Sequence, residues 1–509
     1  MDTRHRCAGP SRRQILAGLA ATPIGFALRP QPAFAQQPPI PLNRLAAKGI
    51  NVGVRQLDAE AWRRAVEADP RLPRSPAELR RLWQGLSAHR RAPGLATQLP
   101  AEECGEHAYG QFFTGLGNPL LRQRDRDDLE AMIDADQPSL GETLETENFV
   151  LRWTNASAHP GDNISDPAIV KETAGYLEAA RARYITVFGR APYTLPGASK
   201  IEVAFTDIGV PLGSSTPEGP ICLNSAKWKN RGIRRPTSAH ELFHKLQYAF
   251  GLRTKYHGSA ADKWFAEGTA SWAEVFMWQR VSAGYKITDL FTHPANSLFD
   301  AEYKALPFWL FFDTHLRGTA DHVPMLDYLR RYHDSGKTVN ALTDAIQADD
   351  RYRDLDTFFA LFGRERRTGH WRVTPAGEQL YPTICGPEDT VLSPSVHMTE
   401  VPMAMGALPL NTSSVSKLGS DYYHFALGPE YAGKLLKVAV QARPGSDFSY
   451  YLIWEKGGTL VRTSFPSAVT GDYSFSKRID PAVADGLVLI ISGRSTGGDY
   501  RMKVEVNQP

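Results

Sequence analysis

The 509-residue sequence lacks several features that would assign it to a simple class. It has only four cysteines and no Cys-x-x-Cys pair, which excludes a zinc knuckle and a dithiol redox motif. No apolar run reaches the roughly 18 to 20 residues that span a bilayer, so we expect no transmembrane segment in the mature chain. Its formal net charge is only +3, which does not indicate a nucleic-acid partner.

The first 35 residues have the features of an export signal. Two adjacent arginines, Arg12 and Arg13, precede a modestly apolar stretch over residues 17–28, and a small-x-small sequence ends at Ala35. This order is typical of a signal peptide, and the paired arginines resemble a twin-arginine signal. We therefore predict that residues 1–35 are removed, that the precursor binds the twin-arginine export machinery, and that the mature chain is periplasmic or secreted.

Removal of this segment changes the charge and the cysteine count. It takes away five arginines and one aspartate and leaves 53 basic and 54 acidic residues, so no nucleic-acid-binding surface is expected. Cys7 is lost as well. In an oxidising compartment the remaining Cys104, Cys222 and Cys385 allow one disulfide and one leftover thiol. The sequence leaves the pairing open.

Periodicity divides the mature chain into three predicted segments. Residues 36–145 are mostly helical and polar, as expected of an accessory domain or a pro-segment. Residues 146–385 mix strands and helices without regular alternation, which indicates an α+β class. Residues 386–509 contain short alternating strands between turn residues, which predicts a β-sandwich. Within them, Gly493 to Gly497 matches a Gly-x-Ser-x-Gly hydrolase pattern, but a strand follows instead of a helix, so we interpret it as a hairpin.

In the middle segment, local signals place the elements that surround two histidines. A helix is predicted to open at Ser165 or Asp166 and to end at Gly189. Residues 220–224 have the pattern of a short edge strand, so Leu223 to Ser225 could pair with an extended substrate backbone. Pro236 then predicts the start of the helix that carries the histidines.

The motif that carries chemistry is His240-Glu241-Leu242-Phe243-His244. Residues four apart on a helix lie one turn above each other, so His240 and His244 can bind a single Zn²⁺. Glu241 lies next round the helix, where its carboxylate can take a proton from metal-activated water. Zinc also needs a third protein ligand. Metzincins place a Gly and a His at the positions that are Gln247 and Phe250 here, so that class is excluded.

A resemblance suggests the third ligand. Trp264 to Trp272 is similar to the Trp-x-x-Glu-Gly-x-Ala motif of gluzincin metallopeptidases. The layout of the chain loosely resembles secreted bacterial metalloproteases of the immune inhibitor A type. The resemblance implies a zincin-like catalytic domain, Zn²⁺ as the cofactor and Glu267 as the third metal ligand. Glu274, two turns later on the same face, is the alternative ligand, or it orients a ligand histidine.

These features predict an activity and a rival to it. The predicted activity is zinc-dependent hydrolysis of peptide bonds in proteins or peptides outside the cytoplasm, with Glu241 as general base. The resemblance also implies a donor for the oxyanion, for which Tyr303 is our candidate, and a packing role is the alternative for this tyrosine. Tyr256, His257 and His315 are further candidates. The rival is a non-catalytic secreted protein that binds surfaces or carbohydrates and has a degenerate zincin domain.

Overall fold

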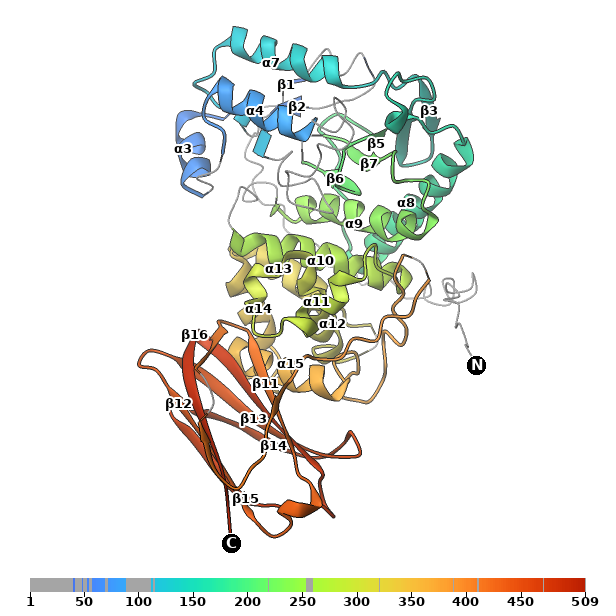
Figure 1. Cartoon of the computed structure of the whole chain (residues 1–509). Coiled ribbons are helices and arrows are strands. Elements are labelled where there is room, and N and C mark those ends of the chain that lie inside the picture. Colours follow the sequence, from blue (N-terminus) through green and yellow to red (C-terminus); the bar gives the residue numbers. More distant parts are fainter. Residues whose placement is uncertain are drawn as a thin grey trace. The chain divides into compact units, whose positions relative to one another are not determined.

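A computed structural model of the chain describes most of the residues after the predicted signal peptide. It describes residues 40–41, 48, 53–54, 57–68, 72–87, 111–112, 115–217, 219–252, 260–319, 321–387, 389–409, 412–469 and 471–508. The predicted signal peptide, Cys104, Tyr256 and His257 lie outside these residues. The fold is mixed α/β, with many helices and a multi-strand sheet region at the C-terminal end (Figure 1). Of the helices described, none is both long and apolar enough to cross a membrane.

The chain forms two compact units that are discontinuous in sequence. The first comprises residues 1–259, 273–283 and 383–391, and the second comprises residues 260–272, 284–382 and 392–509. Helix α10 (Ala260–Trp278) contributes residues to both units. The units do not coincide with the predicted segments, whose independence as domains stays a prediction.

The first unit is built on a five-stranded sheet. Its order is β3-β4-β5-β7-β6, in which β4, β5 and β7 are parallel and the two outer strands are antiparallel to their neighbours. The strands are β3 (Glu142–Glu145), β4 (Phe149–Trp153), β5 (Ile201–Thr206), β6 (Gly213–Ser215) and β7 (Ile221–Asn224). The prediction that residues 220–224 form an edge strand is therefore wrong, because β6 covers that edge. The suggested pairing of Leu223 to Ser225 with a substrate loses its basis.

Two long helices of this unit carry strong local signals. Helix α8 (Pro167–Phe188) is capped by Asp166, whose side chain accepts a hydrogen bond from the Ala168 amide, and it ends at Gly189 in the left-handed region with φ +63°, as predicted. Helix α9 (Arg231–Ala249) begins five residues before the predicted start, with Asn230 as its cap and Pro236 inside it. Pro236 was thus a misleading start signal.

Several helices precede this sheet in the sequence. They include α3 (Ala59–Ala68), α4 (Pro76–Leu86) and α7 (Gln123–Asp136), and the short strands β1 (Ile40–Pro41) and β2 (Gly53–Val54) pair with each other. Apolar residues of α4 and α7 form a core cluster that also includes Ala204 and Cys222. Phe205, the next residue of β5, instead contacts Trp228 at a ring-centroid distance of 6.1 Å. Because side chains alternate along a strand, α4 and α7 lie against one face of the sheet and Trp228 lies against the other.

The second unit contains a helical part. Its helices are α11 (Tyr285–Thr292), α12 (Leu306–His315), α13 (Pro324–Ser335), α14 (Thr338–Gln347) and α15 (Leu355–Thr368), and short 3-10 turns occupy Leu298–Asp300 and Glu302–Ala305. Every residue of α12 is buried, as expected of a helix that is apolar on all sides.

The C-terminal strands are organised around β16 (Gly486–Asn507). Residues 486–493 of β16 pair with β11 and β13, and its second part pairs with β9, β10 and β12. Inward residues from both sets of strands form one hydrophobic core. The predicted hairpin at Gly493 to Gly497 is wrong, because the chain continues through these residues as one strand. The other strands are β8 (Thr399–Val401), β9 (Gly406–Pro409), β10 (Ser413–Ser416), β11 (Ser420–Ala426), β12 (Leu435–Ala442), β13 (Asp447–Lys456), β14 (Thr459–Val469) and β15 (Tyr473–Arg478).

Helix α15 is joined to these strands by polar and cation–π contacts. The Tyr422 hydroxyl donates to the Gly363 carbonyl at 2.7 Å, and the Arg366 guanidinium lies 5.5 Å from the centroid of the Tyr422 ring. Arg367 donates to the Glu455 carboxylate at 2.5 Å. The helical part and the strands of this unit therefore share an interior.

Candidate metal centre

Helix α9 presents two neighbouring polar stripes, because residues separated by four and then three positions lie on one side of a helix. One stripe contains His240, His244 and Gln247, and the other begins with Glu241. All of these side chains are buried, and His240, Glu241 and His244 are at most 2% exposed. Buried polar side chains need partners, and the two stripes find them on different elements.

The first stripe supplies a group that could hold a metal ion. His240, His244 and Glu267 each offer one ligand atom, and these atoms all lie within 4.8 Å of one another. Glu267 lies on α10 and is 3% exposed. The two imidazole rings are 4.9 Å apart between centroids, at an interplanar angle of 79°. The structure thus brings together the three residues that the sequence predicted as metal ligands.

The far side of each imidazole ring is held by an oxygen atom. His240 Nδ1 lies 2.8 Å from Glu274 Oε1, and His244 Nδ1 lies 2.8 Å from Gln247 Oε1. A proton on Nδ1 that is donated to these oxygens leaves the Nε2 lone pair of each ring for a cation. Such contacts orient ligand histidines and raise their basicity.

The Glu274 carboxylate is itself fixed by the chain that follows α10. Its Oε2 accepts a hydrogen bond from the Ser282 amide at 2.7 Å, and its Oε1 accepts one from the Ser282 hydroxyl at 3.1 Å. Burial, together with the nearby Glu274 charge, raises the pKa of Tyr184 well above its ordinary value. Of the two roles the sequence left open for Glu274, these contacts match the one that orients His240.

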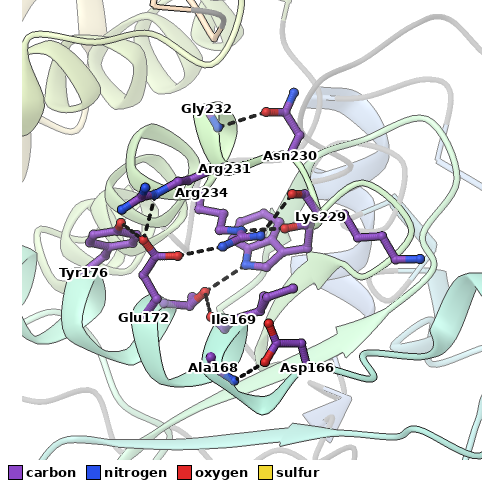
Figure 2. A network of polar contacts seen from close by, with 12 residues as sticks. Asp166, Ala168, Ile169, Glu172, Tyr176, Lys229, Asn230, Arg231, Gly232 and Arg234 are labelled. Atoms are coloured by element: carbon purple, nitrogen blue, oxygen red, sulfur yellow. Dashed lines mark hydrogen bonds and ion pairs between the residues drawn. The ribbon is translucent and has the colours of Figure 1, made fainter. Parts of the chain in front are cut away.

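A polar network fastens the start of α9 to α8 (Figure 2). Glu172 accepts hydrogen bonds from Arg234 at 2.6 Å, Arg231 at 3.2 Å and the Tyr176 hydroxyl at 2.5 Å. Burial alone would raise the pKa of Glu172, but the hydrogen bonds from Tyr176 and Arg234 lower it overall. Arg234 also donates to the Trp228 carbonyl at 2.6 Å. These partners explain why α9 already begins at Arg231.

The second stripe of α9 faces strand β6 and the turn after it. The Tyr248 hydroxyl donates to the Ser215 carbonyl at 2.5 Å. The Lys245 ammonium donates to the carbonyls of Thr216 and Gly219, both at 2.6 Å. Side chains of the helix that carries the two histidines therefore bind backbone carbonyl groups at the end of the edge strand and in the turn after it.

Around Glu267, a glycine allows close packing. A Cβ atom on Gly268 would lie 2.6 Å from Nε1 and 2.7 Å from Cδ1 of Trp309. The Trp309 indole donates to the Trp264 carbonyl at 3.2 Å, and the two rings stack with centroids 5.1 Å apart. Because residue 268 has no side chain, Trp309 can lie close to the backbone of α10 beside Glu267.

The other residues that the sequence singled out include Tyr303 and two of the cysteines. Tyr303 is buried, and the Lys286 ammonium lies 5.1 Å from its ring centroid; its oxyanion role stays a prediction. Cys385 is disulfide-bonded, and Cys222 is a free cysteine. Burial raises the pKa of the Cys222 thiol to about 12, so this thiol is unreactive at neutral pH.

Several residues of the centre were not predicted from the sequence. Gln247 was used only to exclude metzincins, although its spacing of three from His244 is a signal that could have identified it. Ser282 and Lys245 belong to no sequence motif. Their roles depend on which strand and loop the fold brings against α9 and α10.

Comparisons with known proteins leave the family open. No family model matches the sequence, and no curated protein does. Among solved structures, the pre-peptidase C-terminal domain of a collagenase from Bacillus anthracis is similar at 13% identity, over 22% of this chain and 96% of its own, with a TM-score of 0.15. A periplasmic inhibitor of g-type lysozyme from Aeromonas hydrophila is similar at 12% identity, over 21% of this chain and 95% of its own, with a TM-score of 0.16. A 4-O-methyl-α-glucuronidase is similar at 8% identity, over 55% of this chain and 41% of its own, with a TM-score of 0.15. These scores are too low to support an argument about fold or function.

Proposed function

We propose that the chain is an exported zinc-dependent peptidase whose metal is held by His240, His244 and Glu267. The observation that carries the proposal is the convergence of three buried ligand atoms within 4.8 Å of one another. A second observation supports the proposal: the Nδ1 atom of each histidine is hydrogen-bonded, in His240 to Glu274 and in His244 to Gln247. Two solvent-exposed histidines on an ordinary helix would need neither feature.

The donor set favours zinc over calcium and magnesium. Two imidazole nitrogens and one carboxylate are the three protein ligands of many catalytic zinc sites, which leave a fourth position open. Calcium and magnesium prefer sites built from oxygen ligands alone. A bound zinc ion supplies Lewis-acid activation of a water molecule and of the scissile carbonyl group.

The residues of the chain divide the remaining tasks. His240 and His244 would hold the ion through the ring nitrogen that faces away from Glu274 and Gln247, and Glu267 would hold it through a carboxylate oxygen. Glu241 takes the proton of the attacking water on its carboxylate and transfers it to the leaving amine, so that water adds across the peptide bond. Glu274 and Gln247 keep the Nδ1 protons in place. In this proposal the sheet, α8, α9 and α10 form a zincin-like catalytic domain, and the C-terminal strands form a β-sandwich.

The test combines metal analysis with a general protein substrate. The purified chain should contain about one zinc ion per molecule and should cleave fluorescently labelled casein. A chelator should stop cleavage, and added zinc should restore it. Stoichiometric metal without any cleavage of proteins or peptides would instead favour the non-catalytic rival.

A further inference from the structure

Strand β6 lies against the residue proposed as general base. A Cβ atom built on Gly213 would lie 2.7 Å from both Cγ and Cδ of Glu241, and closer still to Oε1. Real Cβ atoms do not approach other atoms this closely, so the Glu241 carboxylate occupies space that is available only because residue 213 has no side chain. Gly213 has an ordinary negative φ, so the backbone conformation does not itself require glycine.

The strand cannot easily move away to make room for a larger residue. Tyr248 and Lys245 hold the backbone at Ser215, Thr216 and Gly219 from α9 itself. Lys245 and Tyr248 lie four and seven residues after Glu241, on the same side of the helix. These hydrogen bonds hold the end of β6 and the turn after it against the part of α9 that follows Glu241.

We infer that Gly213 is a positioning residue that determines where the Glu241 carboxylate lies. Its consequence for catalysis rests on the proposed function, in which Glu241 is the general base. The atoms that a new side chain would meet are the far end of a flexible side chain. An alanine at this position therefore displaces the carboxylate and leaves the helix, the histidines and the metal ligands in place.

The test is Gly213→Ala, with Gly175→Ala as the matched control. A Cβ at Gly175, on α8, meets nothing within 4 Å. Gly213→Ala should retain one zinc ion per chain and a thermal midpoint close to that of the parent. Its kcat on a fluorogenic peptide should fall on the order of a hundredfold, because a displacement of about 1 Å costs that much. KM should change little, since the substrate contacts are not altered. Gly175→Ala should keep the kcat of the parent.

A second measurement separates this inference from the proposed function. A crystal structure of Gly213→Ala should show the Glu241 carboxylate displaced from its position against β6. A carboxylate in its original place, or a kcat equal to that of the parent, overturns the inference. If the parent has no metal-dependent hydrolysis, the proposed function fails, and the crystal structure still decides whether Gly213 places the carboxylate.

Discussion

The Nδ1 atom of His240 lies 2.8 Å from the Oε1 atom of Glu274, and both side chains are buried. Glu267 lies two helical turns earlier on the same helix, within the group that could hold a metal ion. The two glutamates of α10 therefore have different surroundings, although the sequence offered both as candidates for the third ligand.

This difference predicts different losses of metal affinity. Glu267→Ala removes a ligand and should abolish stoichiometric zinc binding. Glu274→Ala leaves all three ligands and should weaken zinc binding by about 10- to 100-fold. Competition with a chromogenic chelator measures both affinities. If Glu274→Ala abolished binding and Glu267→Ala only weakened it, the assignment of the two roles would be reversed.

Glu241→Gln tests the proposed base without changing the size of the side chain. The variant should keep its zinc, because Glu241 is not among the three grouped ligands. Its kcat should fall by about 10²- to 10⁴-fold, which is the usual contribution of a general base. Atomic absorption and a fluorogenic peptide assay check the two outcomes. A variant that cleaves as fast as the parent would show that another group takes the proton.

Gly175→Ala tests the exposed face of α8. The residue is in the helix interior, and the added methyl group meets no atom within 4 Å. Because glycine in a helix costs about 1 kcal/mol relative to alanine, the free energy of unfolding should rise by roughly 0.5 to 1 kcal/mol. Urea denaturation checks this. A lower denaturation midpoint would mean that α8 is not helical at residue 175.

Glu172 should make a pH-dependent contribution to stability. Its pKa is lowered in the folded chain by the hydrogen bonds from Tyr176 and Arg234, against the effect of burial. The stabilisation is therefore complete above the ordinary pKa of a glutamate and is lost as the pH falls through the lower folded value. Glu172→Gln should lower the urea midpoint at pH 7 and have a much smaller effect near pH 3. An effect that grew towards acid pH would contradict the shift.

The contribution of Asp421 to stability should depend on pH in the opposite direction to that of Glu172. Burial raises its pKa in spite of hydrogen bonds from Tyr500 and from Ser413 at 3.0 Å. The unfolded chain therefore releases this proton first as the pH rises, and the ionised carboxylate destabilises the fold above that point. Relative to the parent, Asp421→Asn should be more stable at pH 7 than at pH 3. Urea midpoints at the two pH values test the sign.

The sequence predicted those parts of the fold that depend on local signals. Asp166 and Gly189 bound α8 as expected, because a cap and a left-handed glycine act within a few residues. Pro236 misled because proline is also tolerated where side chains elsewhere support the helix. The contacts of Arg234 with Glu172 and with the Trp228 carbonyl are such a support, and they join residues that no local pattern connects.

The metal ligands were predictable, but their surroundings were not. His240 and His244 follow from helical spacing, whereas the choice between Glu267 and Glu274 depends on Ser282, in the chain after α10. Strand β6 was missed because Gly213 to Ser215 has no apolar alternation and is only three residues long. The importance of a glycine at position 213 depends on its contact with Glu241, which no local sequence pattern predicts.

The contacts between α15 and the C-terminal strands determine where this chain can be shortened. A protein cut after residue 385 would keep α15 but lose Tyr422 and Glu455, which bind the Gly363 carbonyl and the Arg367 guanidinium. Arg366, which is 2% exposed, would lose the aromatic ring of Tyr422 that covers it. Shortened versions of the chain should therefore retain the strands through Asn507, and also α4 and α7, whose core cluster includes Ala204 of the first unit's sheet.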